Sequence, residues 1–191
     1  MTKIVTTPNP VLSGKAQTVK NIDKEIKQII ADMIVALNSA SDPIGVGLAA
    51  PQIGIPLRIF ITKPTISSDI KIFINPKFID SKEKNISEAL PEPKITTKSK
   101  KEKEVKLEGC LSLPNIWGEV KRKPIVTLTY MDEHGKQITK TFRGLMATIV
   151  QHEMDHLDGV LFPKHVLEQK SVLYKSVKDE KGQDIFEEIK I

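Results

Sequence analysis

Residues 145–157 read LMATIVQHEMDHL, and this stretch decides how the chain folds and where its chemistry lies. Its apolar residues recur at helical spacing and form one stripe, made of Leu145, Met146, Ile149 and Val150. Gly159 and then Pro163 follow, and both residues are typical of the end of a helix. The stretch therefore predicts a buried helix over about residues 145–157.

This helix carries two histidines, His152 and His156, with Glu153 beside the first. Residues i and i+4 lie on one face of an α-helix with Cβ atoms about 5–6 Å apart, so both imidazoles can bind one metal ion. Glu153 lies about 100° further round, where its carboxylate can reach a water on the metal, which indicates hydrolysis. The alternative is a pair of hydrogen-bonded core histidines. Two histidines and a glutamate buried without a metal would be costly to satisfy, which favours the metal.

The composition indicates one soluble domain. The chain has 191 residues, 39% of them apolar, which is enough to bury a single core. The N-terminus lacks the apolar run of a signal peptide, and no segment approaches the roughly 20 apolar residues of a membrane span. A single cysteine, Cys110, excludes an intramolecular disulfide, which fits a reducing compartment. We expect a cytoplasmic protein in which Cys110 is free for another role.

The charges are unevenly distributed. Residues 81–107 hold eight Lys against five Glu and so supply +3 of the net charge of +5. A mixed run without aromatic residues is typical of a solvated loop or insertion, and a basic partner surface is the alternative. With few aromatic residues and no recognisable nucleic-acid module, we expect no direct nucleic-acid specificity.

The remaining pattern predicts an α+β fold in which antiparallel strands wrap around the buried helix. Apolar residues at helical spacing predict a first helix over 22–37, with Asn21 or Asp23 as its N-cap. Residues 45–54 are too rich in Gly and Pro for a regular element, but are apolar enough to line a cleft. Four strands and a last helix complete the prediction: strands over 57–62, 70–74, 124–131 and 137–143, the last two joined by a turn that exposes His134, and a helix over 164–178 that frays near Gly182.

A catalytic zinc-type site uses three protein ligands, so a third ligand must lie elsewhere in the sequence. One group of metallopeptidases has a further histidine three residues after a glycine, but this chain has Phe162 there. Downstream glutamates are a second option, but they lie in a polar tail that offers little to hold a ligand rigidly: Glu180, Glu187 and Glu188. A lone cysteine is more often a small core residue. We nevertheless favour Cys110, because a thiolate with two imidazoles suits Zn(II), Fe(II), Co(II) or Ni(II).

Three separated motifs, taken in order, resemble the peptide deformylase family. They are GVGLAAPQ at 45–52, EGCLS at 108–112 and QHEMDHL at 151–157. A weaker N-terminal match extends the resemblance over about residues 4–165. The resemblance implies a catalytic domain over 1–165, with the Lys/Glu-rich insertion at about 81–107, followed by a C-terminal helix and tail over 166–191.

The family implies a metal-dependent hydrolase that removes the N-terminal formyl group from the formyl-methionine of nascent polypeptides and releases formate. Cys110, His152 and His156 would hold the metal, and a metal-bound water would be the nucleophile. Glu153 would act as general base and then as general acid. The alternatives are a metallopeptidase with the same helix motif and a non-catalytic metal-binding or ribosome-binding relative.

The family pattern also implies oxyanion donors and substrate contacts. The side-chain amide of Gln52 and the backbone N–H of Leu111 would stabilise the oxyanion. Glu108 would orient backbone or imidazole groups near the ligands. Substrate contacts are expected from Val46, Gly47, Trp117, Leu145, Thr148 and Ile149. Trp117 stands where the commonest bacterial pattern has an arginine that holds the substrate beyond methionine.

The resemblance favours Fe(II) in the cell, with Zn, Ni or Co as replacements in preparations. It implies an N-formylmethionyl nascent peptide as substrate and leaves open docking on the ribosome near the exit tunnel. The tail, with Glu187 and Glu188 against Lys190, is not convincingly basic. We expect a monomer that does not bind membranes.

Overall fold

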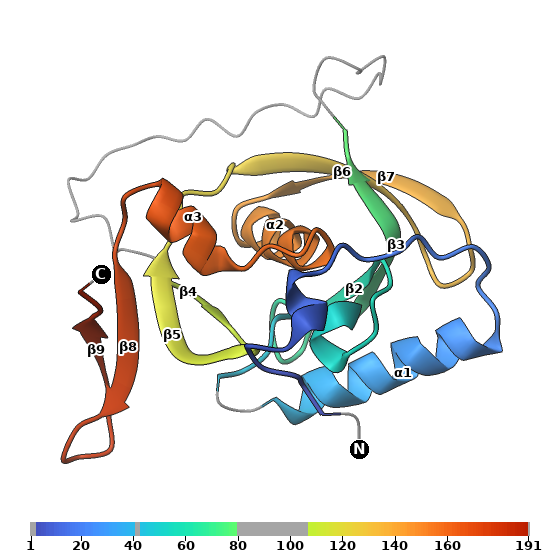
Figure 1. Cartoon of the computed structure of the whole chain (residues 1–191). Coiled ribbons are helices and arrows are strands. Elements are labelled where there is room, and N and C mark those ends of the chain that lie inside the picture. The colour runs from blue at the N-terminus through green and yellow to red at the C-terminus, as the bar shows by residue number, and fades with distance from the viewer. Residues whose placement is uncertain (1–2, 41–42, 80–106, 191) are drawn as a thin grey trace.

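The computed structural model describes residues 3–40, 43–79 and 107–190 (Figure 1). Apart from Leu107, the insertion predicted at about 81–107 lies outside the described residues. The helices are the 3-10 turns η1 (Pro10–Ser13) and η2 (Ala50–Ile53) and the α-helices α1 (Lys24–Ser39), α2 (Leu145–Leu157) and α3 (Phe162–Glu168). The strands are β1 (Gly47–Ala49), β2 (Ile59–Thr62), β3 (Lys71–Phe78), β4 (Leu107–Cys110), β5 (Leu113–Glu119), β6 (Ile125–Met131), β7 (Gln137–Arg143), β8 (Leu173–Lys178) and β9 (Asp184–Glu188).

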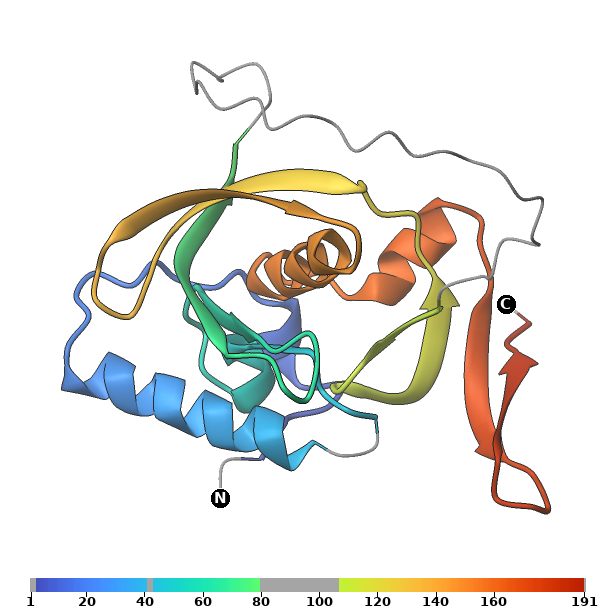
Figure 2. The ribbon, with the colours of Figure 1, turned by 180° about the vertical axis from the view of Figure 1, so that it is seen from behind.

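The strands form two antiparallel sheets around α2. The first sheet has the strand order β1-β2-β3-β6-β7 and the second β4-β5-β8-β9. Helix α2 packs against β1, β2 and β7, and strands surround it when the molecule is viewed from either side (Figures 1 and 2). Helix α1 packs outside the first sheet, against β1 and η2. The predicted α+β fold with a buried central helix is confirmed.

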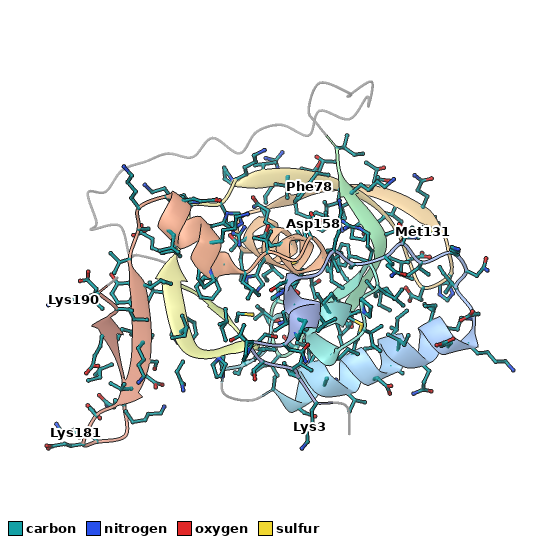
Figure 3. All side chains as sticks on the ribbon, viewed as in Figure 1. Lys3, Phe78, Met131, Asp158, Lys181 and Lys190 are labelled. Atoms are coloured by element: carbon teal, nitrogen blue, oxygen red, sulfur yellow. The ribbon has the colours of Figure 1, made fainter. Side chains whose placement is uncertain are left out.

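Helix α2 is buried because both of its long faces are covered. One stripe, at the spacing expected of a helix, joins the core of the first sheet: Ala147, Val150, Met154 and Leu157. The opposite stripe carries Ile149, His152, Glu153 and His156, which are also buried. Figure 3 shows the side chains that fill the interior around the helix. A polar stripe inside the protein must satisfy its polar atoms locally or through a ligand.

The second sheet is held close to α2 by α3. An ideal Cβ on Gly118 of β5 would lie 2.6 Å from Cγ2 of Val166, so only glycine lets α3 approach the strand this closely. Val166 joins a small core cluster with Phe162, Leu173 and Cys110. The cluster therefore fixes the strand that carries the cysteine beside the helix that carries the histidines.

Two predicted elements agree closely with the structure. Helix α1 begins after Asp23, whose Oδ1 accepts a hydrogen bond from the backbone N–H of Ile26 at 3.0 Å. The β6–β7 hairpin spans nearly the predicted ranges, and the side chain of His134 at its turn is 80% exposed. Among the described residues, no helix is both long enough and apolar enough to cross a membrane.

The helix expected over 164–178 is wrong beyond Glu168. Residues Leu173–Lys178 form β8, which pairs with β5 on one side and with β9 on the other. The partner strand β5 lies more than fifty residues upstream, so its pairing leaves no local sequence signal. The strands β1, β4, β5 and β9 are also absent from the sequence prediction. The division of the chain after residue 165 stays a prediction.

Candidate metal and catalytic site

Cys110, at the end of β4, meets His152 and His156 of α2 in the interior. The potential ligand atoms of these three residues all lie within 4.8 Å of one another, and Cys110 Sγ lies 3.2 Å from His156 Nε2. Sulfur and nitrogen ligands of a tetrahedral zinc ion lie about 3.5 Å apart, so this set fits one first-row metal ion. The alternative ligands Glu180, Glu187 and Glu188 are exposed and do not belong to this group.

The two imidazoles are oriented differently. His152 shares a 2.7 Å hydrogen bond between its Nδ1 and Oε1 of Glu108, which leaves its Nε2 for a metal. His156 points its Nε2 toward Cys110, and its Nδ1 is buried without a partner among the described residues. Burial lowers the pKa of His156 well below 6.5, so this imidazole is neutral, the form that binds metals.

Glu108 is fixed by Arg122, a residue that the sequence analysis missed. The guanidinium donates from Nε to Oε2 at 3.0 Å and from Nη2 to Oε1 at 2.6 Å, and its Nη1 donates to Asp155 Oδ2 at 2.6 Å. Burial alone would raise the pKa of Glu108, but the hydrogen bonds from His152 and Arg122 outweigh it and lower that pKa to about 2. Glu108 is therefore an ionised partner for His152. In the sequence, Arg122 stands between two lysines and has the pattern of a solvated charge cluster.

Glu153 is buried with one carboxylate oxygen free among the described residues. Its Oε2 has no hydrogen-bond partner there, and the side chain is 3% exposed. Burial raises the pKa of Glu153 from 4.5 to about 7, so this carboxylate binds a proton more readily than an ordinary glutamate. An ideal Cβ on Gly47 would lie 2.9 Å from Cδ of Glu153. Gly47 thus makes room for the carboxylate, a reason that the sequence analysis did not foresee.

Gln52 is held in one orientation by three contacts. Its Oε1 accepts a hydrogen bond from the backbone N–H of Ala49 at 2.8 Å, while Nε2 donates to Ser112 Oγ at 3.3 Å. The same Nε2 lies 3.6 Å from Cys110 Sγ. The amide N–H group therefore faces Cys110, one of the three candidate metal ligands. Cys110, His152 and His156 are called the metal-ligand cluster below. No sequence pattern singled out Ser112, whose side chain is fully buried against this amide.

A cavity of about 530 Å³ opens onto these groups. Every residue expected at the site lines it except His156: Val46, Gly47, Gln52, Glu108, Cys110, Leu111, Trp117, Leu145, Thr148, Ile149, His152 and Glu153. Ile149 is nearly buried, whereas Leu145 is 59% exposed and marks the mouth of the cavity. The structure thus gathers residues from both sheets and α2 around one apolar space with a polar end.

A family model described as polypeptide deformylase matches residues 1–172 of the chain. The chain belongs to the peptide deformylase family. Curated peptide deformylases agree over most of their length. The protein from Pseudothermotoga lettingae is 38% identical over 157 residues, covering 81% of this chain and 76% of that protein. The one from Dehalococcoides mccartyi is 34% identical over 185 residues, covering 97% of this chain and 98% of its own.

Solved peptide deformylase structures have the same fold. The enzyme from Legionella pneumophila superposes with a TM-score of 0.70 at 31% identity, covering 86% of this chain and 85% of that one. The enzyme from Thermotoga maritima gives a TM-score of 0.68 at 32% identity, covering 86% and 97%. Peptide deformylases are metal-dependent hydrolases that remove the N-terminal formyl group from nascent peptides. The predicted family and reaction are confirmed, and the alternative metallopeptidase reaction finds no support in these relatives.

Proposed function

We propose that this peptide deformylase works with a metal ion held by Cys110, His152 and His156, and with Glu153 as its base. The observation that carries the proposal is the convergence of three potential ligand atoms within 4.8 Å of one another. They lie beside the buried carboxylate of Glu153, at the cavity that Cys110, His152 and Glu153 line. These residues come from β4 and α2, which are separated by more than thirty residues of sequence. Their meeting at a single point is the arrangement that metal-assisted hydrolysis requires.

Fe(II) is the ion that we propose for the cell. One thiolate and two imidazoles form a soft donor set that accepts Fe(II), Zn(II), Ni(II) or Co(II) and disfavours Mg(II). When bound, the ion lowers the pKa of a water molecule and polarises the formyl oxygen. Glu108 supports this set by holding His152 through a 2.7 Å hydrogen bond.

Glu153 then handles the protons of the reaction. Its carboxylate takes a proton from the attacking water and delivers it to the amine that leaves the formyl carbon. The pKa of about 7 suits both steps, since a base and an acid work best near the working pH. The amide of Gln52 and the backbone N–H of Leu111 donate hydrogen bonds to the formyl oxygen as it gains negative charge.

The methionine side chain enters the apolar part of the cavity, beside Leu145, Thr148 and Ile149 of α2. The backbone of Val46 and Gly47 lines the same space and can pair with an extended peptide. The Synechococcus elongatus peptide deformylase, with a TM-score of 0.65 to this chain, has been solved in complex with actinonin. We propose that actinonin also binds in this cavity.

We place the enzyme in the cytoplasm as a monomer, acting on peptides as they leave the ribosome. The lone cysteine is compatible with a reducing compartment, and the substrate is a nascent chain. All the proposed site residues lie within residues 1–165, the proposed catalytic domain. Docking on the ribosome itself stays a prediction.

Formate release from formyl-Met-Ala-Ser, measured with enzyme purified without oxygen and analysed for metal, tests this proposal. We expect about one Fe(II) per chain, activity that is lost on chelation, and a rate lowered by about 10²–10⁴-fold in Glu153→Ala with metal content retained. A fully metallated Glu153→Ala enzyme with wild-type activity would contradict the assigned role of Glu153. Cleavage of internal bonds in unformylated peptides without formate release would favour a metallopeptidase.

A further inference from the structure

The second sheet has one covered face and one open face. Gly118 of β5 faces α3, since a Cβ there would meet Val166 and Phe162. Successive side chains of a strand point to opposite faces, so Trp117 faces away from α3. Trp117 also lines the cavity that contains His152 and Glu153. The open face of the sheet therefore continues the wall of the cavity.

Trp117 lies flat over the neighbouring strand. It pairs in register with Gly109 of β4, and an ideal Cβ on Gly109 would lie 2.7 Å from Cε3 and Cζ3 of the indole. Glycine at this position lets the ring cover the backbone next to Cys110. The indole is thus placed between the metal-ligand cluster and the outer strands.

The outer side of the indole meets Phe186, a residue of the C-terminal hairpin β8–β9, whose tip carries Lys181 (Figure 3). The two rings lie edge to face, with centroids 5.8 Å apart and planes at 87°. Phe186 lies on the edge strand β9, and 45% of this large aromatic residue is exposed. The two rings together give a continuous apolar surface that is open to solvent.

We propose that Trp117 and Phe186 form a binding subsite for the side chain of the third residue of the formylated peptide, and that this subsite favours apolar side chains. The proposal rests on the proposed function. An extended peptide turns its first and third side chains to the same side, about 6–7 Å apart. With methionine in the cavity beside Ile149, the third side chain is directed along the same wall, which Trp117 forms. The C-terminal hairpin thereby contributes a specificity-determining residue, Phe186.

The test compares kcat/KM for formyl-Met-Ala-Leu and formyl-Met-Ala-Ser in the full-length, metal-loaded enzyme. The selectivity ratio is kcat/KM for the Leu peptide divided by kcat/KM for the Ser peptide. Phe186→Ala removes one aromatic wall of the subsite and is expected to lower this ratio by about threefold to tenfold. Phe186→Leu, which keeps an apolar side chain, is expected to retain most of the ratio. Because Phe186 acts with Trp117, adding Phe186→Ala to Trp117→Ala should change the ratio little further.

Ile185→Ala is the matched control. Ile185 is 44% exposed on the same strand, but its side chain points to the other face of the sheet. The selectivity ratio of Ile185→Ala should therefore stay within about twofold of the wild-type ratio. The proposed subsite would be contradicted if Phe186→Ala kept the wild-type selectivity ratio. It would also be contradicted if Ile185→Ala lowered the ratio as much as Phe186→Ala does. Failure of the wild-type enzyme to release formate from either peptide would instead contradict the proposed function.

Discussion

Gly47 and Glu153 show how a single missing side chain shapes the site. The carboxylate of Glu153 occupies the space where a Cβ on Gly47 would lie, and burial there raises its pKa to about 7. The sequence indicates a base beside two histidines, but the room for that base comes from a strand about a hundred residues upstream. A residue far from the helix motif thus helps to set the position of its glutamate.

Gly47→Ala is expected to lower kcat by roughly tenfold to a hundredfold, because the added methyl group displaces the carboxylate from its position by a fraction of an ångström or more. Metal content should stay normal, since the three atoms nearest to the added methyl group all belong to Glu153 and not to a proposed metal ligand. Formate release with metal analysis measures both quantities. Gly14→Ala is the control, because a Cβ there meets its nearest atoms at an ordinary 3.7 Å. A Gly47→Ala enzyme as active as Gly14→Ala would show that the carboxylate position tolerates this shift.

Arg122→Met is expected to weaken metal binding by about 10–100-fold, because Glu108 loses the guanidinium that orients it toward His152. A competition titration with a chromophoric chelator gives the affinity. Arg143→Met, which alters an exposed arginine of β7, serves as the control. Equal metal affinity in the two variants would mean that Glu108 keeps its position without Arg122.

At the scale of elements, the local sequence predicts that helix α1 exists but does not decide which residue is its N-cap. Its apolar spacing identifies the helix, but both Asn21 and Asp23 are acceptable caps. In the structure the helix begins at Lys24, and Asp23 accepts the hydrogen bond from Ile26. Which of the two residues caps the helix depends on how the preceding segment approaches α1, and packing against the rest of the protein determines that path.

Asp23→Ala should therefore lower the free energy of unfolding by about 1 kcal/mol, whereas Asn21→Ala should change it by less than about 0.5 kcal/mol. Urea unfolding monitored by circular dichroism measures both differences. A larger loss in Asn21→Ala than in Asp23→Ala would be evidence against the observed start of α1.

The C-terminal hairpin is the element that local reasoning failed to find. Residues 164–178 were expected to form one helix, but α3 ends at Glu168 and β8 joins β5. The short strands β1 and β4 were missed for a similar reason. Strands of three or four residues are too short for a clear alternation, and their stability comes from distant partners.

At the scale of the whole molecule, the proposed metal site joins separate parts of the fold. Cys110 belongs to the second sheet, whereas His152 and His156 lie on the helix that packs against the first sheet. An ion bound by all three stabilises the folded chain, since the site does not exist when the chain is unfolded.

Removal of the metal by a chelator should therefore lower Tm as well as activity. A free metal concentration of 100 times Kd stabilises the folded state by about 2.7 kcal/mol, which is lost in the apo protein. Differential scanning calorimetry with and without chelator measures the shift. Cys110→Ala, which lacks one ligand, should show a much smaller shift under the same conditions. Equal shifts in the two proteins would place the stabilising ion at another site.

The sequence by itself determined the buried helix, its paired histidines and glutamate, and the order of three motifs that indicates the family. Those features are local or depend on fixed spacing along one element, so they can be read without coordinates. Only the tertiary structure decided which side chains support them: Arg122 on Glu108, Gly47 beneath Glu153, Ser112 against Gln52 and Phe186 against Trp117. Each of these contacts joins residues at least fourteen positions apart in the chain. Such contacts follow from strand pairing and packing rather than from local pattern, which is why the sequence alone did not reveal them.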